Sequence, residues 1–212
     1  MKVITILCAV ALTTGNPAWA GMEEDVARVR QGWEHVKYEV PVKQQEPEFE
    51  KLTKDSAKVM GQYPKQAEPA IWHGIVEASY AGAKGGLGAL ALAKSARKSL
   101  EQALSINPNA LDGSAYTSLG SLYYQVPGWP IGFGDDRKAL ELLKKGLALN
   151  PNGIDPNYFL GDFLFRAGDY AGAEHALHKA LQAPPREGRR LADEGRRREI
   201  NDLLEKVREK KR

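Results

Sequence analysis

Two histidines three residues apart are the strongest candidates for metal chemistry in this sequence. His175 and His178 fall in one helical stretch, and residues three apart lie on the same side of a helix. A metal site would need a third and a fourth ligand, and Glu174 is the only further ligand type nearby. His35 and His73 stand alone in the sequence. We therefore expect His175 and His178 to be solvated surface histidines, and we expect neither a metal nor another cofactor.

A glycine-rich stretch that ends in two aspartates is the candidate for cation or phosphate binding. Gly132 and Gly134 precede Asp135-Asp136, but the D-x-D-x-D-G ligand order of a calcium loop is absent. Neither of the glycine patterns that cradle phosphate occurs there. Aspartate is favourable at the start of a helix, so we expect this pair to cap a helix that begins near Arg137.

Neither catalysis nor nucleic-acid binding finds a clear framework in the sequence. No G-x-S-x-G or comparable motif surrounds any serine, so no nucleophile, base and orienting acid can be assembled. The formal net charge is only +3 at pH 7, and the basic excess lies in residues 186–212. The clusters Arg189-Arg190 and Arg196–Arg198 could contact phosphate or anionic lipid, but interleaved acidic residues favour a solvated, salt-bridged helix. We expect no enzyme and no nucleic-acid partner.

The first 20 residues are typical of a cleavable signal peptide. Lys2 precedes the apolar run Val3–Leu12, and Ala18-Trp19-Ala20 forms a small-residue cleavage motif before Gly21. Ten apolar residues are too few for a membrane span, which needs about 20. The sequence predicts cleavage after Ala20, a periplasmic or secreted chain of residues 21–212, and no stable membrane anchor. The single cysteine, Cys8, would be removed with the leader.

The residues discussed so far must be positioned by helices. Apolar residues recur at intervals of three and four between Glu23 and Glu39, which predicts an amphipathic helix. A second helix is expected from Pro47, which suits a first helical turn, to about Tyr63. Together they predict a degenerate helical hairpin over residues 23–64.

Residues 154–187 contain the most regular pattern of small and large side chains. Leu160-Gly161 and Leu164 precede a turn, and Ala173, Leu177, Ala180 and Pro185 follow it. This spacing resembles the 34-residue tetratricopeptide repeat. The resemblance implies an all-α solenoid of antiparallel helical hairpins that binds a partner. Two helices can approach closely where Gly161 and Ala173 face one another.

Two longer units precede this repeat, over residues 68–109 and 112–152. Asn107-Pro108-Asn109 recurs as Asn150-Pro151-Asn152 at an offset of 43, and the same offset relates Ala96 to Ala139. Each unit exceeds 34 residues by nine, and we expect the excess in glycine-rich loops over 82–88 and 127–136, the second after Gly120. An amphipathic helix over 189–210 is expected to cap the solenoid. The prediction is a single domain of about four hairpins plus this capping helix.

The family resemblance also implies which residues line the binding groove, namely positions 2, 5, 9, 12 and 13 of each first helix. These residues are Asp155, Tyr158, Asp162, Phe165 and Arg166 in the last repeat, and Ser114, Thr117, Ser121, Tyr124 and Gln125 in the preceding one. Aromatic and polar groups in this mixture suit an extended peptide or a small ligand. Packing of the aromatic residues between hairpins is the alternative.

The lengthened hairpins are similar to those of the periplasmic T component associated with tripartite ATP-independent transporters. That narrower resemblance implies a periplasmic substrate-binding protein as the partner. We expect the loop 126–136 to fold back near Trp72 and the 82–88 loop and to form a recess with Trp129, Phe133, Tyr124 and Tyr158. An alternative function is a small-molecule carrier whose pocket is formed by Trp72, Trp129 and Phe133.

Overall fold

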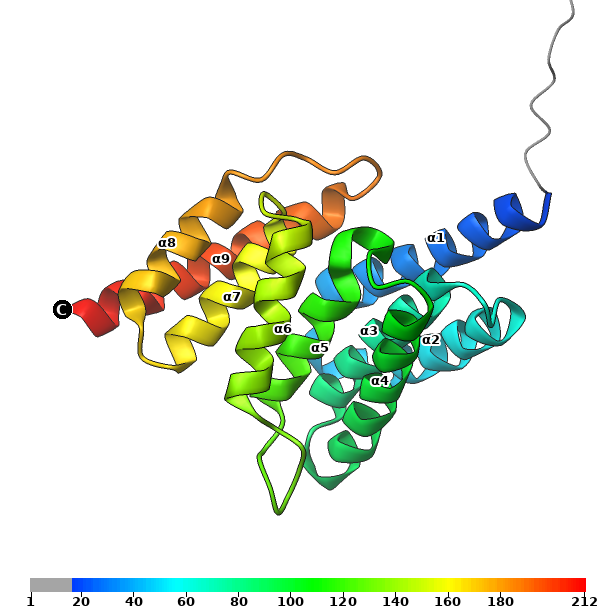
Figure 1. Ribbon diagram of the computed structural model, residues 1–212, viewed down its shortest axis with the longest axis horizontal. Helices are drawn as coiled ribbons and strands as arrows, with labels where there is room; N and C mark the ends of the chain where they lie inside the picture. Colours follow the sequence, from blue (N-terminus) through cyan, green and yellow to red (C-terminus); the bar gives the residue numbers. More distant parts are fainter. Residues whose placement is uncertain (1–16) are drawn as a thin grey trace, which may run out of the picture.

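The computed structural model describes residues 17–212, and the described chain is built almost wholly of α-helices (Figure 1). The predicted leader therefore lies mostly outside the described residues. The helices are α1 (Pro17–Tyr38), α2 (Val42–Gln62), α3 (Ala67–Lys84), α4 (Gly86–Ile106), α5 (Ser114–Gln125), α6 (Asp136–Leu149), α7 (Ile154–Arg166), α8 (Tyr170–Leu181) and α9 (Arg190–Lys211). Ala110–Gly113 forms a short 3-10 helix before α5. None of the helices in this part of the chain is long and apolar enough to cross a bilayer.

Consecutive helices pack in pairs, and the pairs stack into a solenoid. The strongest contacts join α3 with α4, α5 with α6, and α7 with α8, while α1 packs on α2 (Figure 1). The last helix, α9, does not pair with a successor. It contacts α8 and α7, and it also reaches α1 at the opposite end of the chain. The predicted all-α solenoid of hairpins is therefore confirmed.

A glycine on each first helix sets how closely the paired helices approach. A Cβ atom at Gly161 would lie 2.8 Å from Cγ of Leu177 and 3.4 Å from the carbonyl oxygen of Ala173. Both Ala173 and Ala180 are fully buried at this contact. The same arrangement occurs in the two preceding hairpins, at Gly74 with Leu100 and Ala96, and at Gly120 with Leu143 and Ala139. The three hairpins therefore share one crossing geometry, in which a larger side chain would force the helices apart.

The glycine-rich stretch 82–88 is not a loop, which corrects the sequence prediction. Helix α3 continues to Lys84, and α4 begins at Gly86. The chain reverses at Gly85 and Gly86, whose φ angles are 64° and 59°. A glycine inside a helix costs about 1 kcal/mol relative to alanine, but the long contact between α3 and α4 offsets that cost. The additional residues of this unit lengthen its two helices.

Helix α2 also begins earlier than expected, at Val42, so Pro47 lies inside the helix and not in its first turn. The turn before α2 is held by Gln45, whose Nε2 donates to the carbonyl oxygens of Lys37 and Val40 at 3.2 and 3.0 Å. This local anchoring fixes the helix start, and α2 continues through Pro47 although a proline inside a helix removes a backbone hydrogen bond and crowds the carbonyl four residues earlier.

Candidate functional site

Helix α9 covers part of the groove face predicted from the repeat pattern. Arg196 is 7% exposed, and its Nε donates to Asp155 Oδ1 at 2.8 Å. Its guanidinium also lies 4.3 Å from the ring centre of Tyr158 and 4.8 Å from that of Phe159. Asp155 receives a second bond, of 2.6 Å, from Arg186. Two predicted ligand-binding positions of α7, Asp155 and Tyr158, therefore bind the chain's own C-terminal helix.

The beginning of α9 extends this contact to the N-terminal hairpin. Arg189, just before the helix, forms an ion pair with the buried Glu34 of α1 and stacks over the ring of Trp72 at 5.3 Å. Gly195 lies against Tyr38 so closely that a Cβ atom there would fall 2.3 Å from the ring. The expectation of a solvated helix is wrong for this side of α9, where Arg189 and Arg196 are packed against the rest of the chain. The sequence shows the acidic and basic residues but not which of them face the core.

The pKa values of the groove residues follow from this burial and pairing. Burial alone would raise the pKa of Asp155, but Arg196 and Arg186 outweigh it and hold this pKa well below its usual range. Burial raises the pKa of Tyr158 to about 12, although Arg196 opposes the change. Asp155 is therefore anionic and Tyr158 neutral at physiological pH, and they form a structural ion pair and a cation–π contact with α9.

The other predicted groove residues are also largely engaged within the chain. Tyr124 donates a hydrogen bond of 2.8 Å to Asp162, and the guanidinium of Arg166 lies 5.4 Å from the Tyr124 ring centre. Burial raises the pKa of Tyr124 well above its ordinary value. Phe165 packs against Tyr170. Ser114 and Ser121 are half-buried, Thr117 is buried, and Gln125 and Arg166 are exposed. The uncovered part of the groove therefore offers few free polar groups.

The loop between α5 and α6 has a fixed shape in spite of its glycines. Gly134 N–H donates to Pro127 O at 3.0 Å, and the amides of Ile131 and Gly132 both donate to Gly128 O. Asp135 N–H donates to Tyr123 O at 2.9 Å, and the Asp135 carboxylate accepts from Lys138 N–H at 3.0 Å, as expected of a helix cap.

Two of these glycines are required by the close approach of the backbone within the loop. A Cβ atom at Gly134 would lie 1.9 Å from Val126 O, and one at Gly132 would lie 2.3 Å from Pro127 O. A side chain at either position would force the loop open.

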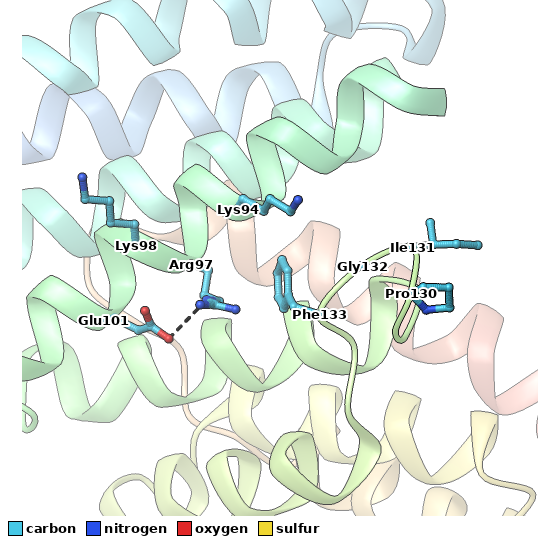
Figure 2. A pocket seen from close by; sticks show the side chains of 8 residues that line it. All are labelled: Lys94, Arg97, Lys98, Glu101, Pro130, Ile131, Gly132 and Phe133. Carbon is cyan, nitrogen blue, oxygen red and sulfur yellow. Dashed lines mark ion pairs between the residues drawn. The ribbon is translucent and has the colours of Figure 1, made fainter.

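This ordered loop packs against α4 and not against Trp72, which corrects the predicted recess. Phe133 stacks edge-on with Tyr123 at 5.4 Å and lies under the guanidinium of Arg97 at 4.9 Å (Figure 2). Trp72 belongs to a different buried cluster, where it packs on Trp33. Of the residues proposed for the carrier pocket, Trp72 is therefore not brought together with Trp129 and Phe133.

The loop and α4 enclose an open recess of about 410 Å³. It is lined by Pro130, Ile131, Gly132 and Phe133 on one side and by Lys94, Arg97, Lys98 and Glu101 on the other (Figure 2). Trp129, beside the recess, is 90% exposed, and Ile131, which lines it, is 67% exposed. Among the predicted site residues, Trp129 and Phe133 thus contribute to one surface feature. The α4 residues were missed because their register relative to the loop depends on tertiary packing.

A buried polar cluster that no sequence motif indicates lies between α2, α3 and α4. His73 Nδ1 lies 2.8 Å from Ser56 Oγ, and its Nε2 lies 3.5 Å from Glu77 Oε1. Ser99 Oγ donates to the other Glu77 oxygen at 3.1 Å. All four side chains are buried. Although serine, histidine and glutamate form a contiguous set, no substrate can reach the serine, so we interpret the cluster as structural.

The pKa of His73 gives a testable pH dependence of stability. Burial lowers this pKa below the ordinary value, although Glu77 partly opposes the change. The unfolded chain therefore binds a proton at a pH where folded His73 does not, so stability is lost as pH falls below about 6.5. We expect this one group to reduce the free energy of unfolding by at most about 1.4 kcal/mol per pH unit. Urea unfolding between pH 7.5 and 5 measures the slope.

The matched variants for this test are His73→Asn and His175→Asn. Asparagine at position 73 can still hydrogen-bond Ser56 and does not titrate, so the slope should become shallower. His175 is exposed on α8, and its replacement should leave the slope unchanged. Equal slopes in wild type and His73→Asn would contradict the assignment.

No group of three or more histidine, cysteine, aspartate or glutamate residues in the described part of the chain could hold a metal ion. His175 and His178 are both exposed on α8. The sequence-based expectation of surface histidines at these positions agrees with their placement.

Comparison with known proteins places this fold among helical-repeat structures. A tetratricopeptide repeat family model matches residues 131–193. The fold is similar to the crystal structure of TTC0263, a thermophilic tetratricopeptide-repeat protein of Thermus thermophilus, with 16% identity and a TM-score of 0.63 over 88% of this chain and 80% of that chain.

Two further structures are similar at lower scores. A crystal structure of MamA has 21% identity and a TM-score of 0.46 over 80% of this chain and 92% of that chain. The PilF protein of Pseudomonas aeruginosa has 17% identity and a TM-score of 0.37 over 88% and 90%. A search of curated protein sequences finds no match.

Proposed function

We propose that this chain, which is a tetratricopeptide-repeat protein, is a non-catalytic module that binds another protein through the α5–α6 loop and the adjoining face of α4. The repeat fold itself suggests protein–protein interaction or assembly.

The observation that carries the proposal is an apolar loop tip that is exposed although its backbone is ordered. Trp129 and Ile131 are 90% and 67% exposed, while hydrogen bonds and two tightly packed glycines fix the loop around them. Tryptophan is enriched among residues that dominate binding energies at protein interfaces. A preorganised loop loses little conformational entropy on binding. The loop therefore has the properties of a partner-binding anchor.

The occupation of the groove by α9 supports the choice of this surface. Asp155 and Tyr158 already contact Arg196, so a partner peptide that used them would first have to displace a helix with a buried apolar face. Gln125 and Arg166 remain exposed on the groove side. They are too few to form a groove interface comparable with the loop surface.

The cellular setting in this proposal is the periplasm or the exterior of the cell, because residues 1–20 are typical of a cleaved leader. A periplasmic substrate-binding protein is then a suitable partner, and the chain would be an accessory to a transport system. The similarity of its lengthened hairpins to the T component associated with tripartite ATP-independent transporters supports this assignment.

No specific observation favours the alternative of a small-molecule carrier. The recess beside the loop is open, and its α4 wall consists of charged side chains, whereas carrier sites usually bury most of the ligand surface. The buried Ser56–His73–Glu77 cluster likewise gives no support to catalysis, because these residues are at most 6% exposed.

Site-specific photo-crosslinking tests the proposed function. A photoreactive amino acid in place of Trp129 should crosslink a partner protein in cells, whereas the same amino acid in place of Val42 should not. Val42 is a suitable control because it is 79% exposed and lies at the start of α2. In affinity purification, Trp129→Ala with Ile131→Ser should reduce recovery of that partner at least about tenfold, as expected for loss of interface anchors.

The same experiment includes a position in the groove. Crosslinks that form at Arg166 but not at position 129 would move the binding site to the groove and overturn the proposal. Phe133 is left unchanged in these variants because it packs on Tyr123, so its truncation would also affect stability.

A further inference from the structure

We propose that the segment bound at the loop–α4 recess carries carboxylates next to an apolar side chain. This inference rests on the proposed function and specifies the chemistry of the partner. It concerns the outer surface of the solenoid and not the groove on the first helices.

The charged wall of the recess is unevenly paired. Arg97 forms an ion pair with Glu101 at 3.3 Å and also covers Phe133, so its charge is used within the chain. Lys94 and Lys98 are exposed, lie one helical turn apart and have no ion pair among the described residues. Two like charges at this spacing destabilise a helix slightly. A carboxylate between them would remove the repulsion.

The apolar wall is formed by the loop on the other side of the same recess. Ile131 and Phe133 line the same recess as Lys94 and Lys98 (Figure 2), and Trp129 is exposed at the adjoining tip. Apolar and cationic groups therefore converge on one concave site, which is the complement of an acidic segment with an apolar anchor.

The shape and charge of this surface favour a protein segment over an anionic membrane. Segments that lie on a membrane typically combine an extended apolar face with many Lys and Arg residues, whereas here two apolar residues, Trp129 and Ile131, are exposed at a short loop tip and Lys94 and Lys98 line a concavity. Two lysines would add only weak attraction to an anionic surface. Membrane binding is retained as an outcome of the experiment.

A displayed library of random decapeptides is the probe. Selection on the full mature chain, with counter-selection on Trp129→Ala/Ile131→Ser, should enrich peptides in which Asp or Glu flanks a large apolar residue. The Lys94→Gln/Lys98→Gln variant should bind these peptides about tenfold more weakly. The expected effect is no larger because each exposed ion pair contributes little binding energy. Raising the salt concentration should weaken peptide binding by the wild type and should hardly affect peptide binding by the lysine variant.

The control variant is Lys206→Gln/Lys210→Gln on α9. It removes the same charge from two exposed lysines with the same spacing, and it should bind the peptides as the wild type does. Equal weakening of both lysine variants would indicate a nonspecific effect of net charge and would overturn the inference.

The remaining outcomes separate this inference from the proposed function. Selected peptides without acidic enrichment, or binding that survives Lys94→Gln/Lys98→Gln, would overturn the acidic partner and leave the loop as a binding surface. An empty selection would overturn the peptide site. If vesicles with phosphatidylglycerol then bound in a Trp129-dependent manner, the surface would be a membrane contact and the proposed function would also fail.

Discussion

A chain that ends at Gly188 is expected to lose its monomeric fold. The truncation removes α9, whose side chains Ile200, Leu203, Leu204 and Val207 are all buried. Burial of such a side chain contributes about 1.5–3 kcal/mol, so four contribute about 6–12 kcal/mol. The stability of a typical domain is about 5–15 kcal/mol. The truncation should therefore produce aggregation or a large loss of helicity per residue.

Both ends of the solenoid depend on this helix. The C-terminal half of α9 covers Leu177 and Ala180 in the last hairpin, and Ala192 near its start packs into the N-terminal cluster with Trp33. Removal would therefore expose apolar surface at two places, and exposed patches of this kind promote association.

The truncation can be checked by light scattering coupled to gel filtration, together with far-UV circular dichroism. A chain that ends at Val207 is the matched control, because residues 208–212 are exposed. It loses the ion pair between Lys211 and Glu174, which should matter little on the surface. A monomeric 188-residue chain with undiminished helicity per residue would show that α9 contributes little to the fold.

The sequence predicts the hairpin seam well because that seam depends on contacts of fixed spacing. Gly161 faces Ala173 and Leu177 because the two helices join through a short turn, so a local pattern determines a tertiary contact. The equivalent glycine of the long hairpin, Gly74, was not identified. Gly74 and Gly120 are 46 residues apart, while Ala96 and Ala139 are 43 apart. An alignment of the two units without gaps, at an offset of 43, therefore pairs Gly74 with Thr117 and not with Gly120.

Prediction of structure from the sequence fails where tertiary packing outweighs local conformational preference. The glycines at 82 and 88 indicate a loop, but the contact of α3 with α4 keeps both in helices. The stretch 127–136 has a lower proportion of glycine but does form a loop, because Pro127 and Pro130 cannot continue a helix there. The position of α9 against α1 depends on contacts between residues more than 150 apart, such as Arg189 and Glu34. Local periodicity contains no information about such contacts.

In the candidate site, too, the sequence predicts local features but not the contacts that depend on tertiary packing. Trp129 and Phe133 could be identified because apolar residues in a glycine-rich loop are unusual, but their neighbours Lys94 and Lys98 could not. Tyr124 and Asp162 were identified from the repeat register, and the structure joins them by a hydrogen bond within the chain. A residue that the repeat register assigns to the groove can thus be occupied by the protein's own side chains.

Replacement of Arg196 by methionine is expected to lower the free energy of unfolding by about 3 kcal/mol, the lower end of the range for removing one partner of a buried ion pair, because Arg196 is buried but the side chain of Asp155 is 30% exposed. Methionine preserves much of the apolar contact with Tyr158 and Phe159. The loss therefore arises mainly from the carboxylates that Arg196 neutralises, Asp155 at 2.8 Å and Glu199 at 2.6 Å. Arg198→Met on the exposed side of α9 is the control and should change stability by less than about 0.5 kcal/mol.

A double variant separates the ion pair from simple loss of packing. In Arg196→Met the carboxylate of Asp155 keeps Arg186 as a partner at 2.6 Å but loses Arg196. In Arg196→Met/Asp155→Asn this less well neutralised carboxylate is removed as well, so the double variant should be less destabilised than the sum of the two single variants. The wild type should also lose stability in acid. Because the folded-state pKa of Asp155 is depressed, its contribution is complete above the unfolded pKa and is lost as pH falls toward the folded value. Urea unfolding at pH 7 and pH 3 measures both effects. Strictly additive single variants, with no smaller acid sensitivity in Asp155→Asn than in the wild type, would show that Arg196 stabilises the closed solenoid by packing alone.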